Sequence, residues 1–583
     1  MDKAKKSFVN THTHIFTIKN VPPLLAKCFL PWPFYYLLHL KVVKVFFKVF
    51  IWAEIKLKRL KYFRTSLINF FKTRILGRIF YYVFALGLLF NAGMFLLSAF
   101  NVEQGDSLIR TALNKIVDSP IQPALIYNNH ISFLALIIAS IYILYPEAWS
   151  FLFNFAKKIF SVLKFLPSNK SIAFIKRYFN IMKFANYSKQ KRIFDKLVKM
   201  SEADARFVVL PMDMEYMGAG KVEQSYLDQL EEINEVFIKS LKNHEKMIPF
   251  LFVDPRRIRG KEGKKFFDWE IEEKEEKGVK RKTILLKDCL VKKYLEKKAN
   301  DPSTGNFKGI KLYPALGYYP FDEDLLPLYY YCVDNNIPLL THCVEGTIFW
   351  RGKMKKEWNQ HPVFERANSP LMTKAGNNFD LQNNFTHPLN YLVLLESRYL
   401  YRVIKNSSNQ KLKELFDFNE RNKTVNNKLS KLALNIAHYG GVEQWEKYLN
   451  LDRNEFSFEL KENPDQGVSF TTSQRSGKEL LSKPADLYFK KADWFTIISS
   501  MMLQYENVYS DISYILHSDK MMPLLNDMLL NNERLSKKIL YGTDFFVVRN
   551  HKSEKQLYCD LLATIGSANM DLIARDNPAN WLK

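Results

Sequence analysis

The sequence predicts an α/β chain folded as a (β/α)8 TIM-type barrel. Short apolar, β-branched runs recur along its 583 residues, and segments long enough for helices separate them. Strands that alternate with helices form a parallel sheet buried on both faces, and eight such units close into a barrel. The length is too great for a minimal domain, but it suits a large barrel that carries insertions.

The eight expected strands share one pattern, an apolar run that gives way to polar residues at its carboxyl end. They cover residues 8–14, 206–213, 248–254, 309–314, 337–342, 434–438, 507–513 and 539–544. The clearest helical patterns between them are 189–200, 227–243, 325–335 and 494–505. Because the chemistry of such barrels lies at the carboxyl ends of the strands, we expect these polar residues to meet at one mouth.

Five residues with metal-ligating side chains end four of these runs: His12, His14, His342, His438 and Asp544. The first two stand two positions apart, and side chains at i and i+2 point to the same face of a strand. Such a pair can bind one divalent cation. A single histidine of this kind is more often a core residue with satisfied hydrogen bonds, but five such ligand residues at the ends of four strands favour a metal site.

The order of these residues resembles that of the amidohydrolase superfamily. More narrowly, it is similar to the amidohydrolase-related branch (amidohydrolase 2), which includes aminocarboxymuconate-semialdehyde decarboxylase. The matching segments include NTHTHIF (10–16), GIKLYPALGY (309–318), PLLTHC (338–343), NIAHYGG (435–441) and LYGTDFF (540–546). The resemblance covers residues 7–16 and 187–583, and it implies the same barrel fold.

The resemblance also implies a ligand set and a mechanism. His12, His14, His342 and Asp544 would bind one Zn²⁺, or another divalent cation such as Mn²⁺ or Fe²⁺. The cation would bring the pKa of a water molecule towards about 7. Asp544 would take its proton as the general base. His438 would lie just outside the ligands or bind the metal directly, and it would hold the water and stabilise the oxyanion with the metal.

Three basic residues are candidates for substrate binding. Lys311 would contact a substrate carboxylate, bridge two metals after carboxylation as in some superfamily members, or close its strand structurally. Arg256 and Arg257 form a fork that suits a carboxylate or phosphate, or they form salt bridges to a loop. Asp213 and Asp511 also end strands, and we expect them to cap the helices that follow.

We therefore expect a metal-dependent hydrolase that cleaves a C–N or C–O bond of a small organic substrate through metal-activated water. One alternative is a non-oxidative decarboxylase that uses the same residues. A second alternative, from another class, is a membrane-associated scaffold whose barrel is catalytically inactive. The resemblance favours a homodimer.

The expected domain organisation is a first strand at 7–16, an insertion at 17–186, and the rest of the barrel at 187–583. The insertion is apolar, basic and helical in pattern, and Ile79–Val102 holds no charged residue over a length that would cross a bilayer. Lys41, Lys44 and Lys48 recur at helical spacing among apolar residues, as in a helix on an anionic membrane surface. The insertion would thus span or lie on a membrane, or pack on the barrel or on a second subunit.

The charge balance limits the partners. A net charge of +25 calls for an acidic partner, and an anionic membrane surface is one such partner. Nucleic acid is not expected, because no recognition motif is present. Five cysteines without a CxxC pair and the absence of a signal-peptide pattern predict a cytoplasmic protein, attached to the inner face of the membrane if residues 34–145 bind lipid. The densely charged segment Glu262–Lys298 is expected to be an exposed helix or a mobile loop.

Overall fold

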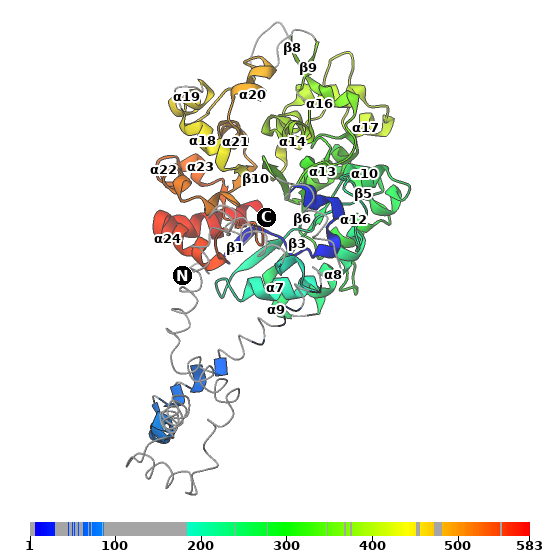
Figure 1. Ribbon diagram of the computed structural model, residues 1–583. Coiled ribbons are helices and arrows are strands. Elements are labelled where there is room, and N and C mark those ends of the chain that lie inside the picture. The colour runs from blue at the N-terminus through cyan, green and yellow to red at the C-terminus, as the bar shows by residue number, and fades with distance from the viewer. Residues whose placement is uncertain are drawn as a thin grey trace, which may run out of the picture. The chain divides into compact units, whose positions relative to one another are not determined.

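The structure is a computed structural model, and it divides into two units, residues 1–45 with 176–583 and residues 46–175. It describes residues 6–28, scattered positions between 45 and 86, and residues 183–239, 241–276, 278–346, 348–366, 369–373, 376–450, 455–471, 481–547 and 551–583. The first unit holds a parallel sheet surrounded by helices (Figure 1).

Eight parallel strands form the sheet, and they follow one another in chain order. They are β1 (Val9–Thr13), β2 (Arg206–Val209), β3 (Met247–Phe252), β6 (Gly309–Leu312), β7 (Leu339–Val344), β10 (Leu434–Gly440), β11 (Val508–Asp511) and β12 (Ile539–Leu540). The backbone N–H of Thr11 donates to Tyr541 O at 2.9 Å, and Thr13 pairs with Phe545. These contacts join the first strand to the chain that follows the last, so the predicted barrel is confirmed.

Helices follow the strands as the sequence predicts. The four expected helices appear as α7 (Gln190–Val198), α8 (Tyr226–Ile238), α13 (Leu326–Asp334) and α21 (Trp494–Gln504). Further helices of at least eight residues are α14 (Asn378–Thr386), α16 (Ser397–Asn406), α18 (Val442–Leu449), α19 (Glu455–Glu462), α22 (Met522–Asn531) and α24 (Glu554–Asp571). Side-chain caps define where several of these helices begin. Ser225 accepts from Asp228 N before α8, and Asp493 accepts from Thr496 N before α21.

A buried apolar cluster fills the barrel below the polar strand ends. It contains Val9, Val208, Leu210, Ile248, Phe250, Leu340, Ala437, Tyr509, Leu540 and Trp581. Trp581 comes from the C-terminal helix α25 (Asn577–Trp581), and its Nε1–H donates to Ala433 O, just before β10, at 3.3 Å. The C-terminal helix therefore packs at the amino ends of the strands and leaves the carboxyl ends for the polar residues.

The expectation for Glu262–Lys298 is wrong, because much of this segment is an antiparallel hairpin. Its strands are β4 (Trp269–Glu276) and β5 (Val279–Leu286), followed by α12 (Leu290–Leu295). Acidic and basic residues face each other across the pair, as Glu273 and Lys282 do. Cross-strand pairs of opposite charge stabilise a hairpin, so a charged run need not be helical.

Most of the insertion lies outside the described residues, and so do the predictions placed on it. Lys41, Lys44 and Lys48 are not described, nor are residues 87–102 of the apolar stretch or the stretch 131–145. Described positions between 45 and 86 are almost all helical. In the part of the chain that the structure describes, no helix has both the length and the apolar character that a membrane crossing needs.

Candidate metal centre

An irregularity in β1 turns the first two histidines into the barrel. Val9 belongs to the interior cluster, and side chains alternate along a strand, so His12 and His14 would face outward from a regular strand. The pairing of β1 with β2 slips between Asn10 and Thr13. A slip of this kind reverses the alternation, and both histidines are buried on the inner side.

His12, His14 and Asp544 bring one ligand atom each to a common point. Asp544 Oδ1 lies 3.4 Å from His14 Nε2 and 3.8 Å from His12 Nε2, and the three atoms lie within 4.8 Å of one another. Ligands about 2.1 Å from one tetrahedral ion lie roughly 3.4 Å from each other. His14 Nδ1–H donates to Leu210 O at 3.0 Å, which leaves Nε2 as its lone-pair nitrogen. The spacing therefore fits a divalent cation.

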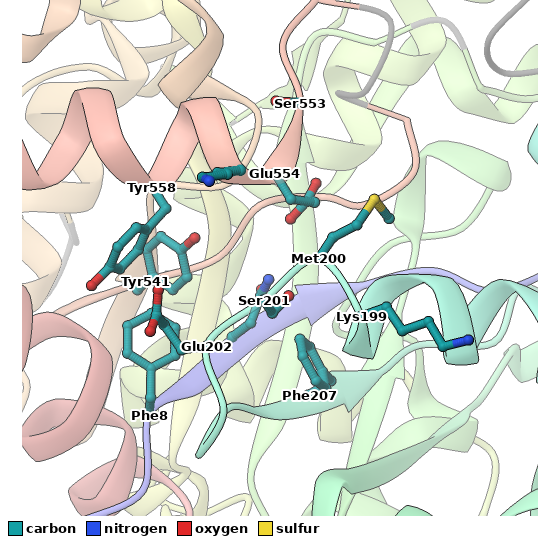
Figure 2. Close-up of a pocket in the computed structure, with 12 residues that line it drawn as sticks. Phe8, Lys199, Met200, Ser201, Glu202, Phe207, Tyr541, Ser553, Glu554 and Tyr558 are labelled. Atoms are coloured by element: carbon teal, nitrogen blue, oxygen red, sulfur yellow. The ribbon is translucent and has the colours of Figure 1, made fainter. Parts of the chain in front are cut away.

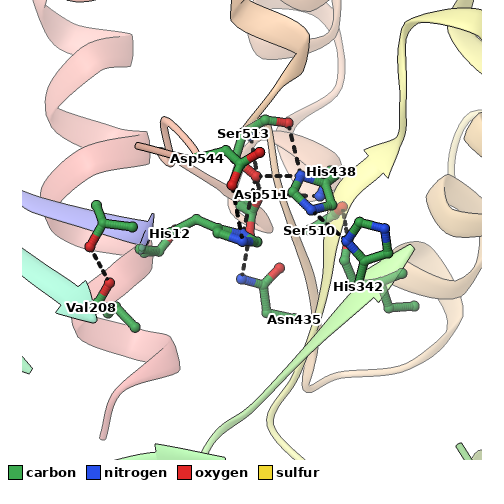
Figure 3. A network of polar contacts seen from close by, with 12 residues as sticks. His12, Val208, His342, Asn435, His438, Ser510, Asp511, Ser513 and Asp544 are labelled. Atoms are coloured by element: carbon green, nitrogen blue, oxygen red, sulfur yellow. Dashed lines mark hydrogen bonds and ion pairs between the residues drawn. The ribbon is translucent and has the colours of Figure 1, made fainter. Parts of the chain in front are cut away.

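Asp511 organises the site from the end of β11. Its carboxylate accepts from His12 Nδ1–H at 3.1 Å, from Asn435 Nδ2 at 2.9 Å and from the backbone N–H of His438 at 3.1 Å (Figure 3). Ser513 also donates to it, from both its backbone and its hydroxyl. The expectation that Asp511 caps a helix is wrong. Both of its carboxylate oxygens accept hydrogen bonds from buried groups of the site. Tyr514, not Asp511, stands at the capping position before the next helical turn.

Asp213 was also expected to cap a helix, and that expectation is wrong as well. Ser225 takes the capping position before α8, while the Asp213 carboxylate pairs with Arg257 at 2.8 Å.

His438 and His342 form the other side of the cluster. Their rings share a hydrogen bond of 2.9 Å between His438 Nε2 and His342 Nδ1, and Ser513 Oγ lies 2.8 Å from His438 Nδ1. The His342 ring stacks on Tyr313 with centroids 3.9 Å apart. His12, His438 and Asp511 form a second group whose ligand atoms lie within 4.8 Å of one another. All four predicted histidines thus line one buried space.

Burial keeps these imidazoles neutral. Loss of water lowers the pKa of His14 to about 3, and it lowers the pKa of His12, His342 and His438 well below the usual value. The nearby positive charge of Lys311 adds to the effect at His12 and His14. Neutral imidazoles offer lone pairs, which is the form that binds a metal.

Burial also shifts the pKa values of Lys311 and Asp544, which lie in the same buried space as the histidines. Burial lowers the pKa of Lys311 to about 7, although the carboxylates of Asp511 and Asp544 oppose the shift. Burial raises the pKa of Asp544 well above its usual value, and Lys311 opposes that shift. Among the described residues, Lys311 Nζ and the Nε2 atoms of His12 and His342 are buried without a hydrogen-bond partner. These atoms are placed to meet a cation or a substrate group, so the residues present fit the implied metal.

Arg256 and Arg257 follow β3 and are both engaged within the protein. Arg256 makes a two-point contact with Asp254 (Nε–Oδ1 2.8 Å, Nη2–Oδ2 2.5 Å) and donates through Nη1 to Tyr216 O and Leu316 O. Arg257 pairs with Asp213 at 2.8 Å and with Glu215 at 3.2 Å. These contacts join the loops that follow β2, β3 and β6. Both arginines therefore join loops, and substrate binding by them stays a prediction.

A cavity of about 550 Å³ lies elsewhere, on the outer side of the barrel wall (Figure 2). Asn10 and Phe207 line it from β1 and β2, together with Phe8 just before β1, Tyr541 and residues at the start of α24. None of the clustered histidines borders it. It is therefore separate from the candidate metal centre.

Three contributors to the centre escaped the sequence reasoning: Asn435, Ser513 and Tyr313. Asn435 and Tyr313 stand on or next to strands that carry predicted site residues, and Ser513 lies two positions after Asp511. Their position at or near the polar ends of strands could have identified them, because the same position identified the histidines.

The fold and the site together define a (β/α)8 barrel with a buried His–Asp centre at its carboxyl mouth. No protein-family model matches the chain, and no curated protein matches it. Solved structures do match, over about two thirds of this chain.

One similar structure is an amidohydrolase II, with 10% identity, a TM-score of 0.31, and coverage of 67% of this chain and 88% of that one. Another is 5-carboxyvanillate decarboxylase from Novosphingobium aromaticivorans DSM 12444, complexed with manganese and 4-hydroxy-3-methoxy-5-nitrobenzoic acid (13% identity, TM-score 0.29, coverage 68% and 84%). A third is an amidohydrolase from Mycobacterium avium subsp. paratuberculosis K-10 (11% identity, TM-score 0.28, coverage 68% and 76%). The chemistry considered below rests on the residues of the site itself.

Proposed function

We propose that this chain is a metal-dependent hydrolase of the amidohydrolase superfamily, acting on a C–N or C–O bond of a small organic substrate. One observation carries the proposal: His12, His14 and Asp544 converge within 4.8 Å in a buried space. The low pKa values of the histidines support it, because they leave neutral nitrogen ligands at physiological pH.

His12, His14, His342 and Asp544 would hold the cation, and their nitrogen and oxygen atoms suit Zn²⁺, Mn²⁺ or Fe²⁺. When bound, the cation would supply Lewis acidity, which activates water at neutral pH and polarises the bond under attack. His342 Nε2 is buried without a hydrogen-bond partner, which supports its place in this set. Its other ring nitrogen is fixed by His438 at 2.9 Å.

Asp544 is the proposed general base. Its carboxylate stands between His12 and His14, at 3.8 and 3.4 Å, and so lies next to the atoms where the nucleophile would be held. It would accept the proton of the attacking water and return it to the leaving group. His438 is fixed by Ser513 through Nδ1, and its Nε2 lies 2.9 Å from His342 Nδ1. In the neutral ring Nε2 carries the lone pair, so His438 would orient His342 for the cation, and the cation itself would stabilise the oxyanion.

Lys311 favours a substrate that carries a carboxylate. Its Nζ is buried without a hydrogen-bond partner, and its pKa of about 7 allows a bound carboxylate to draw a proton onto it. The same observation favours the second candidate function, a non-oxidative decarboxylase. In that reaction Lys311 would hold the carboxylate that leaves as CO₂.

Metal analysis tests the proposal first. We expect about one equivalent of a divalent cation in the purified protein, lost in His12→Ala and Asp544→Asn but kept in His244→Ala, which changes an exposed histidine away from the site. Circular dichroism of each variant separates loss of metal from loss of fold. Wild-type protein that binds no divalent cation would support the inactive scaffold instead.

Isotope labelling then separates the two reactions. The metal-loaded enzyme would be offered amides, esters, lactones and aromatic carboxylic acids in H₂¹⁸O. Hydrolysis places ¹⁸O in the product, whereas decarboxylation releases CO₂ and leaves the remaining product unlabelled.

A further inference from the structure

A helix in the second unit turns its apolar side chains to solvent. Residues 75–83 and 85–86 are helical. The large exposed side chains, with their exposed fractions, are Ile75 (79%), Leu76 (66%), Ile79 (55%), Phe80 (62%), Tyr82 (64%), Val83 (63%) and Leu86 (66%). At about 100° per residue, these seven positions fall within an arc of roughly 160°. We call them the outward apolar face.

The side of this helix that packs against other parts of the chain is narrower than the outward apolar face. Gly77 is buried, and Tyr81 and Ala85 are half-buried. Gly77 approaches the backbone of Phe70, and Tyr81 contacts the ring of Phe71 at 6.1 Å. A helix of a water-soluble protein turns its apolar stripe inward. This one packs through its narrow side and leaves its wide apolar side without a protein partner among the described residues.

Positive charge is dense in the sequence just before and at the start of the outward apolar face. Arg74 and Arg78 are both exposed, the first just before the helix and the second within it, and Arg78 lies on the flank of the apolar arc. Residues 41–78 contain eleven lysines and arginines and one acidic residue, Glu54, which gives 11 − 1 = +10. The exposed aromatic residues Trp52 (61%) and Phe63 (61%) lie in the same stretch. Aromatic rings and basic side chains are typical of the membrane–water interface.

We propose that the outward apolar face binds an anionic lipid bilayer, with the helix lying in the headgroup region. The apolar arc would enter the acyl boundary while the basic residues meet anionic headgroups. A second copy of this chain fits less well, because it would bring another +10 segment against the first. Nucleic acid would satisfy the charge but would leave the aliphatic arc in water.

Vesicle co-sedimentation of the full-length protein tests this surface. We expect binding to phosphatidylcholine vesicles that contain phosphatidylglycerol, weak binding to phosphatidylcholine alone, and loss of binding as NaCl is raised. Lys56→Glu/Arg74→Glu should weaken binding by about tenfold or more. Phe80→Ser/Val83→Ser should weaken it by about tenfold at every salt concentration.

Matched variants control for charge and for surface apolarity. Lys280→Glu/Lys490→Glu makes the same charge change on exposed lysines of the barrel unit, at 77% and 66% exposure. Phe458→Ser/Leu530→Ser removes exposed apolar side chains of that unit, at 54% and 65% exposure. Both should bind vesicles like the wild type.

Three results would overturn the proposal. The first is equal binding to neutral and anionic vesicles, and the second is unchanged vesicle binding by Phe80→Ser/Val83→Ser. The third is a change of oligomeric state in that variant while vesicle binding persists, which would make the face a subunit interface. Metal content plays no part in these outcomes, so they are independent of the proposed reaction.

Discussion

Asp511 shows how one residue can orient a site without taking part in its chemistry. Its two carboxylate oxygens hold the His12 ring, the Asn435 amide and the backbone of His438, so it joins β1 and β10 to its own strand, β11. A carboxylate on Nδ1 of a histidine fixes the tautomer that presents Nε2 and makes that nitrogen more basic. We regard Asp511 as a positioning residue.

Replacement of Asp511 by asparagine should therefore weaken metal binding. We expect an affinity about 10–100-fold lower, because the amide cannot replace the charged acceptor for His12. Competition with a chelating dye measures the affinity. Asp213→Asn is the matched control, since that carboxylate is also buried at a strand end but pairs with Arg257. Equal affinities in the wild type and Asp511→Asn would contradict the role.

Lys311 offers a test that separates stability from function. Its buried Nζ has no hydrogen-bond partner, and a buried amine of this kind costs free energy. Lys311→Met keeps the length of the side chain, so the melting temperature should equal or exceed that of the wild type, while turnover of carboxylate-bearing substrates should fall. A lower melting temperature of the metal-free variant would indicate that the lysine stabilises the fold.

At the scale of elements, the backbone at the strand ends determines where the side chains of the candidate site point. β10 ends in left-handed backbone, with φ of 70° at His438, 45° at Tyr439, 81° at Gly440 and 86° at Gly441. Left-handed residues turn the chain abruptly, and here they aim His438 into the barrel before α18 begins. Asp544, with φ of 54°, is placed by a similar turn after β12.

Gly441→Ala tests the importance of this turn. A Cβ at this position would lie 2.2 Å from Val344 Cγ2, and the backbone is unfavourable for alanine. We expect a loss of about 1–3 kcal/mol in the free energy of unfolding, measured with urea. Gly278→Ala is the control: its φ is 77°, but a Cβ there meets nothing within 4 Å. Similar losses in both variants would show that the contact with Val344 is unimportant.

The sequence predicts the eight strands well because each is a short apolar run bounded by polar residues. It predicts the histidines for the same reason, since a polar residue that ends a buried run is conspicuous. The slip in β1 and the paired charges of the β4–β5 hairpin depend on a neighbouring strand. The partners of Arg256 come from three loops, and only tertiary structure brings these together. Such features cannot be found from one segment at a time.

At the scale of the whole molecule, the buried histidines link stability to pH. The pKa of His14 is about 3 in the folded chain and near 6.5 when exposed, so between these values the unfolded chain binds the extra proton. Stability from a neutral His14 is thus full above about pH 6.5 and is lost as the pH falls. Asp544 acts in the opposite sense, because its pKa is raised on folding.

Comparison of wild-type protein with His14→Gln isolates this contribution in the metal-free state. The difference in the free energy of unfolding should shrink by about 1.4 kcal/mol for each pH unit below 6.5. Urea titrations at pH 8, 6.5 and 5 measure it. A difference that stays constant from pH 8 to pH 5 would show that His14 is as easily protonated in the folded chain as in the unfolded one.

The closure of the barrel has a consequence for biosynthesis. Asn10 donates to Thr543 across 533 positions of sequence, and His12 and Asp544 stand next to this contact. During translation the first two histidines leave the ribosome long before the carboxylate that completes their group. If these side chains hold the proposed cation, all of them can bind it only after translation has passed Asp544, so loading would follow the synthesis of the barrel and would report that the last strand has docked.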